Sequence, residues 1–363
     1  MEGFLYCLPS VFAIENRYEI LVFAKENGII KIRTGNSVFY EENNGTLSSE
    51  KRFAKISVPQ SVLNENKSYT VLYRKTIDRK IYYPTFEEEE SLTFAFRPLE
   101  KTENINVYHI ADIHRAFCSA LKTADFFGDD TDLYIINGDI GEVRNEQDYC
   151  DVANLTGEIS KGEIPVIFSR GNHDARGKCA DRFTEFFPAD GKNTYYTFDL
   201  GVLSGIVLDC GEDKLDNHRE YNGVNVFERF RERETEFISG AKLNNDKINF
   251  AVCHICPVFP TENQGDCFDI ERETYKVWND NLKRMGIRFM LTGHIHKEFV
   301  IEKHSAKCFC DNDYTIIVGS AVDYDTEYVA GAALTVSKTD LRVRFTDTEH
   351  KVLFDKTYDI RSD

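Results

Sequence analysis

The hydrophobic pattern of the first hundred residues is that of a β protein. Short apolar runs rich in β-branched and aromatic residues follow one another, several with alternating polar positions. The runs cover Tyr18–Lys25, Gly28–Thr34, Phe53–Val58, Ser68–Arg74, Lys80–Tyr83 and Ser91–Phe96. Asn27-Gly28 lies between the first two and predicts a tight hairpin. Residues 1–98 are therefore expected to form a small all-β sandwich domain with no helix.

The pattern changes after the polar connector 98–104, where strands begin to alternate with amphipathic helices. Helices are expected near 116–127, 146–161, 226–241 and 272–285. The predicted strands are Ile105–Ala111, Leu133–Asn137, Pro165–Ser169, Tyr195–Leu200, Gly205–Leu208, Ile248–Cys253, Arg288–Leu291 and Thr315–Val318, with a β-rich tail over 332–360. Alternation of this kind predicts an α/β layered domain over residues 104–363.

Composition narrows the class of partner and the compartment. The formal net charge of −17 disfavours nucleic acid as a partner, because an acidic chain repels polyanions. We expect no membrane span, since no apolar run approaches the roughly 20 residues required, and no signal peptide. The ten cysteines include Cys253-x-x-Cys256 but no second pair with zinc-site spacing. Reduced cysteines and a cytoplasmic location are the expectation.

Chemistry-bearing residues follow five of the predicted strands of the second region. The five stretches are Asp112-x-His114, Gly138-Asp139, Gly171-Asn172-His173-Asp174, His254 and Gly293-His294-x-His296. In open α/β sheets the carboxyl ends of neighbouring strands share one edge, and ligands bind there. We therefore expect these side chains to gather in one place.

Such a cluster needs cations, because buried carboxylates repel one another and imidazoles need partners. Histidine, Asp and Asn without thiolate suit manganese, iron, zinc, cobalt or nickel. The two chelating pairs, Asp112 with His114 and His294 with His296, flank an Asp139 that can bridge, which favours two ions over one. Two-metal sites clamp the attacking and leaving oxygens of phosphoryl transfer.

The five stretches, taken in this order, resemble the calcineurin-like metallophosphoesterase superfamily from residue 104 to the end of the chain. The resemblance implies a two-sheet α/β sandwich and a binuclear centre of two divalent or mixed-valence transition metal ions. One ion would take Asp112, His114 and His296, and the other Asn172, His254 and His294, with Asp139 bridging both. It also implies a bridging hydroxide as the nucleophile and His173 as proton donor to the leaving group, or as a phosphate contact.

Other residues near the motifs have less specific signals. Glu142 lies three residues after Asp139, where similar protein serine/threonine phosphatases keep an acid that orients the catalytic histidine; a solvated loop glutamate is the alternative. Asp174 could orient the same histidine or cap the following helix, and the cap is favoured. Neighbouring arginines and one histidine are weaker candidates for holding phosphate or for forming part of a lid: Arg115, Arg170, Arg176 and His218. His109, His304 and His350 have no motif partners and are expected not to be ligands.

Two departures narrow the resemblance. The N-terminal strands, ending in Ser91–Pro98, resemble the fibronectin-like domain of purple acid phosphatases. Those enzymes carry a metal-binding tyrosine where this chain has Glu142, and they lack the equivalent of His114, so their charge-transfer colour is not expected here. The Asp-Arg-Gly run that follows the bridging Asp of protein phosphatases is replaced by Gly141-Glu142-Val143-Arg144. Protein phosphatase activity is disfavoured.

The sequence thus predicts a cytoplasmic metal-dependent hydrolase of small phosphate esters. The ligands do not separate phosphomonoesters from phosphodiesters, because the metals activate water alike for both. Two alternatives stay open: a nuclease of the same chemistry, which the acidic charge disfavours, and a non-catalytic scaffold with a vestigial site, which the full ligand set disfavours. The role of the N-terminal domain and the oligomeric state are not readable from the sequence.

Overall fold

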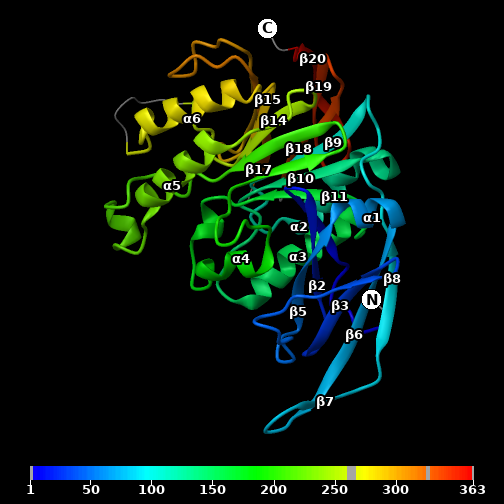
Figure 1. The fold of residues 1–363 in the computed structure, drawn as a ribbon. Helices are drawn as coiled ribbons and strands as arrows, with labels where there is room; N and C mark the ends of the chain where they lie inside the picture. Colours follow the sequence, from blue (N-terminus) through cyan, green and yellow to red (C-terminus); the bar gives the residue numbers. More distant parts are fainter. Residues whose placement is uncertain (1–2, 260–266, 324–327, 362–363) are drawn as a thin grey trace.

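The computed structural model describes residues 3–259, 267–323 and 328–361, which are arranged around two β-sheets (Figure 1). The larger sheet has the strand order β12-β13-β14-β15-β17-β18-β9-β10-β11-β1-β2-β5, with β16 on β17 and with β19 joining β18 to β20. The smaller has the order β4-β3-β6-β7, with β8 also on β6. The strands are β1 Ser10–Ile14, β2 Arg17–Phe23, β3 Gly28–Thr34, β4 Ser37–Phe39, β5 Phe53–Pro59, β6 Ser68–Arg79, β7 Pro84–Phe86, β8 Glu90–Ala95, β9 Ile105–Ile110, β10 Leu133–Asn137, β11 Pro165–Ser169, β12 Tyr196–Leu200, β13 Leu203–Leu208, β14 Ile248–Cys253, β15 Phe289–Thr292, β16 Lys297–Ile301, β17 Thr315–Asp323, β18 Tyr328–Val336, β19 Asp340–Thr346 and β20 Val352–Asp359.

The large sheet folds into two halves that pack face to face. One half contains the parallel strands β9, β10 and β11, and the other the parallel strands β13, β14, β15 and β17. The halves are joined where the end of β17 pairs with the start of β18. Side chains of both halves, such as Ile135 and Val252, meet in one buried cluster. Helices cover the outer faces, so the expected two-sheet α/β sandwich is confirmed.

The helices cover the two outer faces separately. Helices α2, α3 and α4 pack on the half that contains β9–β11, and α5 and α6 pack on the other half. The helices are α1 Gln60–Asn66, α2 Phe117–Ala124, α3 Glu146–Ser160, α4 Phe183–Phe186, α5 Phe227–Gly240 and α6 Arg272–Arg284. On α6 the buried side chains Tyr275, Trp278 and Leu282 repeat with helical spacing, which explains why its sequence pattern was readable.

The N-terminal strands form two layers, and one of these layers continues the large sheet. Strand β1 pairs in parallel with β11, and β2 and β5 extend the sheet beyond it. The five-stranded sheet packs over them, with Ile32 and Val71 in the same buried cluster as Ile20 and Ile56. The two regions thus share one hydrogen-bonded sheet, while the domain boundary at 98–104 stays a prediction.

Three local predictions for the N-terminal region were wrong. The expected strand Lys80–Tyr83 is not a strand and lies in the connection between β6 and β7. Asn27-Gly28 does not make a hairpin, because β2 pairs with β1 and β5 whereas β3 pairs with β4 and β6. Gly28 instead lets β3 approach β6: a Cβ there would lie 2.5 Å from the Tyr73 ring. The expectation of no helix also fails, since α1 connects β5 to β6 and buries Leu63.

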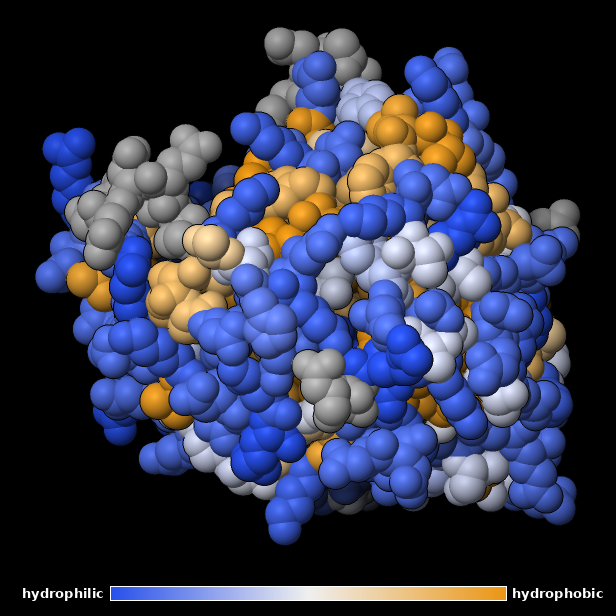
Figure 2. Space-filling view, turned by 90° about the horizontal axis from the view of Figure 1, so that it is seen from above, coloured by the Kyte–Doolittle hydropathy of each residue, from blue (hydrophilic) through white to orange (hydrophobic). Residues whose placement is uncertain are grey.

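Figure 2 shows one face of the molecule, on which hydrophilic residues predominate and hydrophobic residues gather in a few groups between them. Among the described helices, none is both long and apolar enough to cross a membrane.

Candidate metal centre

The loops that follow β9, β10, β11, β14 and β15 converge on one point. Within the described ranges, three overlapping groups of side chains have ligand atoms within 4.8 Å of one another. The groups are Asp112 with His114 and His296; His114 with Asp139 and His173; and Asp139 with His254 and His294. Five strand ends that are far apart in the sequence therefore deliver the predicted side chains to one place, as the topology of parallel strands requires.

Asp112, His114 and His296 form one side of the cluster. His114 Nε2 lies 3.2 Å from His296 Nε2, and Asp112 Oδ1 lies 3.5 Å from His296 Nε2. The Asp112 carboxylate is fully buried and accepts the His294 backbone N–H at 2.9 and 3.0 Å. This backbone contact ties the loop after β15 to the loop after β9 and orients the carboxylate.

Asn172, His254 and His294 form the other side, and Asp139 lies between the two sides. Asn172 Oδ1 is 3.1 Å from His294 Nδ1. Asp139 Oδ2 is 3.2 Å from His254 Nε2 and 3.7 Å from His114 Nε2 on the first side. One carboxylate oxygen therefore faces both groups of donors.

His254 carries the observation that decides whether these donors fit a metal ion. Its Nδ1 donates to the Asn137 carbonyl oxygen at 2.7 Å, which fixes the ring orientation and directs Nε2 at the cluster. Nε2 is buried, lies 3.2 Å from Asp139 and 3.6 Å from Asp112, and makes no hydrogen bond of good geometry to any of the described residues. A buried nitrogen held against two carboxylates needs either a proton or a cation, so the donor set fits a metal ion.

The backbone of the cluster is held in an unusual conformation. Five of the seven predicted ligands have a positive φ: Asp112, His114, Asp139, His294 and His296, with φ between 44° and 71°. Residues other than glycine adopt this region rarely, and such outliers concentrate at functional sites. The glycines of the motifs permit close approach of the loops: a Cβ on Gly293 would lie 2.7 Å from Asp112 Oδ2, and one on Gly171 would collide with Asp139.

Burial and charge set the ionisation of these groups. Burial raises the pKa of Asp112 to about 7. Burial also lowers the pKa of His114 and His294 to about 4. Burial disfavours the charged form of His254 as well, but attraction to Asp139 and Asp112 outweighs it and raises the pKa to about 10. The neutral imidazoles of His114 and His294 are competent ligands as they stand, whereas His254 would give up its Nε2 proton to a metal ion. The carboxylates attract positive charge at the point that a metal ion would occupy.

His173 lies at the exposed side of the cluster. Its backbone N–H donates to Asp139 Oδ1 at 2.8 Å, and its Nε2 is 4.0 Å from Asp139 Oδ2. Nη1 of Arg176 lies 3.2 Å from the same Nε2. Glu212, which is buried, holds Arg176 in place through Nε and Nη2, each at 2.7 Å.

Glu142 is not brought to His173 by any contact within the described ranges. Its carboxylate pairs with Nε of Arg144 at 2.9 Å, and its side chain is about half exposed. The residue whose side chain contacts His173 is Arg176, through the Arg176–Glu212 pair. Sequence reasoning missed Glu212, although it follows the end of β13 as the other site residues follow their strands.

Asp174 has a role other than the predicted helix cap. Its Oδ2 accepts the backbone N–H groups of Asp139 and Gly171, both at 2.8 Å. The buried carboxylate therefore joins two of the loops that carry predicted ligands, and the expectation of a cap was wrong. A carboxylate can bind local backbone donors without any helix to cap.

Of the arginines near the motifs, Arg115 and Arg170 make internal pairs. Arg115 contacts Asp148 at 3.0 Å. Arg170 contacts Asp209 at 2.7 Å and lies over the Phe227 ring, so it braces the loop.

The remaining histidines lie outside the three metal-capable groups. His218 accepts the Glu220 backbone N–H and packs beside Tyr221. His109 is buried against Asn137, His304 contacts Asp311, and His350 contacts the Lys122 carbonyl oxygen. Within the described ranges, none of the four belongs to a group that could hold a metal ion.

A match to a protein-family model agrees with the geometry of the side-chain cluster. The family model described as calcineurin-like phosphoesterase matches residues 105–298, which is more than half of the chain. The chain belongs to the calcineurin-like phosphoesterase family. The matched residues include every strand-end motif that contributes a side chain to the candidate metal centre.

Solved structures of other proteins share the fold of this calcineurin-like phosphoesterase. The purple acid phosphatase PPD1 from yellow lupin (Lupinus luteus) seeds matches with a TM-score of 0.61 and 10% identity, over 96% of this chain and 73% of the lupin chain. PhoD matches with a TM-score of 0.57 and 11% identity, over 100% and 94% of the two chains. Identities this low show the fold alone. A comparison with curated protein sequences found no significant match.

Proposed function

We propose that this chain hydrolyses small phosphate esters at a binuclear centre of transition metal ions. One ion would be held by Asp112, His114 and His296, the other by Asn172, His254 and His294, and Asp139 would contact both. The observation that carries the proposal is the position of Asp139 Oδ2, 3.2 Å from His254 Nε2 and 3.7 Å from His114 Nε2. An oxygen that faces donors on both sides is the arrangement that a bridging ligand needs.

The donor set supports manganese, iron, zinc, cobalt or nickel, since it combines imidazole, carboxylate and amide oxygen without thiolate. When bound, such ions polarise the phosphate and lower the pKa of water, which supplies a nucleophile at neutral pH. Everything else in the reaction depends on how the chain's own side chains hold the substrate and move its protons.

His173 is the proposed proton donor to the leaving alcohol. Its backbone is fixed to Asp139, which keeps the imidazole at the cluster, and its side chain is 41% exposed and so can be reached by substrate. Arg176 is the proposed phosphate contact: Glu212 holds one edge of its guanidinium, and Nη1 faces the His173 ring. Glu142, three residues after Asp139, is a weaker candidate for orienting His173, because it pairs with Arg144.

The clustering of the predicted ligands supports an active enzyme over a scaffold with a vestigial site. The nuclease alternative is disfavoured by the net charge of −17. The cytoplasmic location stays a prediction.

The test is a substrate panel run with the metal varied. The purified chain is loaded separately with each of the five metals and assayed on p-nitrophenyl phosphate, bis(p-nitrophenyl) phosphate and a short duplex DNA. We expect hydrolysis of one of the two small esters, its loss in chelator and its return with metal. The absence of metal-dependent hydrolysis with all five metals would contradict the proposal, and preferential cleavage of DNA would favour the nuclease.

A further inference from the structure

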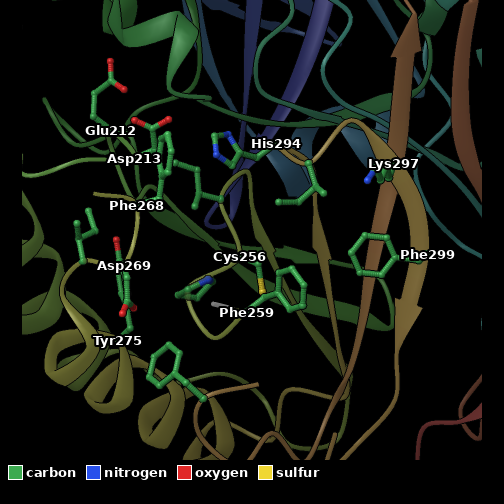
Figure 3. A pocket seen from close by; sticks show the side chains of 15 residues that line it. Glu212, Asp213, Cys256, Phe259, Phe268, Asp269, Tyr275, His294, Lys297 and Phe299 are labelled. Carbon is green, nitrogen blue, oxygen red and sulfur yellow. The ribbon is translucent and has the colours of Figure 1, made fainter. Parts of the chain in front are cut away.

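A cavity of about 360 Å³ opens directly beside the metal cluster. His294, one of the predicted ligands, is part of its wall, and Asp213 lies next to it. Figure 3 shows these two side chains at one side of the cavity and Cys256, Phe259 and Phe299 across from them. Anything bound in this cavity is therefore adjacent to the site where phosphate would be hydrolysed.

The wall away from the cluster is apolar and largely aromatic. Phe259 and Phe299 contact each other with ring centroids 5.8 Å apart, and Phe309 and Tyr275 complete the surface. Phe259, Phe299 and Phe309 are only partly buried and pack against the hydrophobic cluster beneath α5 and α6. Partly exposed rings in a concave wall are typical of a site that takes an apolar group, because filling the cavity removes their faces from water.

The carboxylates around the cavity are already matched within the protein. Glu212 pairs with Arg176 at 2.7 Å. Asp213 accepts from the Tyr221 hydroxyl at 3.0 Å and from Lys214 at 3.2 Å. Asp269 pairs with Arg272 at 2.5 Å. With these carboxylates paired and the Lys297 side chain also lining the cavity, the cavity favours an uncharged organic group over an ammonium group.

We infer that the substrate is a phosphate ester with an apolar alkyl or aryl group, which lies in this cavity while its phosphate lies at the metal cluster. This inference rests on the proposed function and specifies the class of substrate. It assigns the aromatic wall, defined by Phe259, Tyr275, Phe299 and Phe309, to substrate selection. A short or strongly polar ester would leave the wall in contact with water and bind more weakly.

The test measures binding of n-alkylphosphonates, from methyl- to hexylphosphonate, to the metal-loaded full chain by calorimetry. The series keeps the anionic head group constant and changes only the tail, and no hydrolysis is involved. We expect the Kd to fall about fourfold per added methylene, which is ~0.8 kcal/mol per buried methylene converted at ~1.4 kcal/mol per tenfold. The measured quantity is the ratio of the Kd for methylphosphonate to the Kd for hexylphosphonate. Each variant is thereby compared with its own affinity for the shortest tail.

Two wall variants and one control make the test specific. Phe299→Ala and Phe309→Ser remove apolar area from different elements of the wall, and thermal melting checks that each folds. Phe94→Ala removes a partly buried phenylalanine from β8, in the five-stranded sheet. We expect the Kd ratio to fall at least threefold in both wall variants and to stay unchanged in the control.

The possible outcomes separate this inference from the proposed function. Equal affinity for all tail lengths, together with metal-dependent hydrolysis of a small ester, would overturn the inference and leave the proposed function standing. A strong dependence on tail length that both wall variants retain would also overturn it, since the tail would then bind elsewhere. Failure of every phosphonate to bind, together with no metal-dependent hydrolysis, would contradict the proposed function itself.

Discussion

Seven of the predicted site residues divide into an inner group and an outer group. Asp112, Asp139, Asn172 and His254 form the inner group, and each is at most 2% exposed. The outer group is His114, His173 and His296, whose side chains are 10%, 41% and 31% exposed. The inner side chains are as deeply buried as those of the hydrophobic core, whereas the outer side chains are in contact with solvent.

The difference in exposure corresponds to a difference in how the residues are held. Backbone N–H groups from neighbouring loops fix the carboxylates of Asp112 and Asp139, and the Asn137 carbonyl oxygen fixes His254. The outer His173 is in contact with a side chain, that of Arg176. This teaches that the inner group is suited to holding ions in a fixed geometry, while the outer group combines two proposed ligands, His114 and His296, with His173, which is suited to contacting substrate. Substitutions in the two groups should therefore have different effects.

Asp139→Asn should have the largest effect on the inner group. The substitution keeps the shape but removes the charge shared between the two sides, so metal should be lost along with activity. We expect kcat/KM to fall by more than the ~10–100-fold that is typical when a residue that only hydrogen-bonds to a metal ligand is replaced. The metal content, measured by mass spectrometry, should fall below that of the wild type. Near-normal turnover would rule out the bridging role.

His173→Ala tests the outer group and should have the next largest effect. Loss of a general acid typically costs ~10²–10⁴-fold in rate, and no ligand is removed. We expect kcat to fall within this range while metal content is retained, which steady-state kinetics and metal analysis measure on the same sample. Parallel loss of metal would show that His173 is a ligand and would contradict its role as the proton donor.

Asp174→Asn should weaken the inner group indirectly. The Asp174 carboxylate accepts two backbone N–H groups, in the loops that carry Asp139 and Asn172. The substitution replaces this charged carboxylate by a neutral amide, whose oxygen is the weaker hydrogen-bond acceptor. We expect metal affinity, measured by competition with a chelating dye, to fall by ~10–100-fold. Asp181→Asn, on an exposed residue of the same region, is the control and should leave metal affinity unchanged.

Glu142→Gln should have the smallest effect, and Arg176→Gln is its matched comparison. Glu142 pairs with Arg144 on the surface, where an ion pair contributes little, whereas Arg176 contacts His173. We expect less than about a threefold change in kcat/KM for Glu142→Gln and about tenfold or more for Arg176→Gln. A larger loss for Glu142→Gln would restore it as the residue that orients His173.

The clustering of the proposed ligands could be predicted because each motif follows an apolar strand in the sequence. Each motif between Asp112 and His296 marks the end of a strand. Because these strands are parallel, their ends lie together at one edge of the sheet. Helix α6 was predicted for the same kind of reason, since its buried side chains repeat with helical spacing. Local pattern and tertiary structure agree in these segments.

The features that sequence reasoning missed depend on contacts between distant segments. Gly28 was taken for a turn residue, but its lack of a side chain serves the close approach of β6. Strand β1 joins β11 across more than 150 residues, and neither segment carries a sign of the other. Asp174 and the Arg176–Glu212 pair also act through partners on other loops. The positive φ angles of five ligands are equally invisible in the sequence, because Asp and His are not residues that mark this conformation as glycine does.

The most direct test of the account is the position of the metal ions. Crystals of the manganese-loaded chain, measured at the manganese absorption edge, should show two anomalous peaks on either side of Asp139. One peak should lie among Asp112, His114 and His296, and the other among Asn172, His254 and His294. A single peak with no contact to Asp139, or ions bound only outside this cluster, would contradict the binuclear centre.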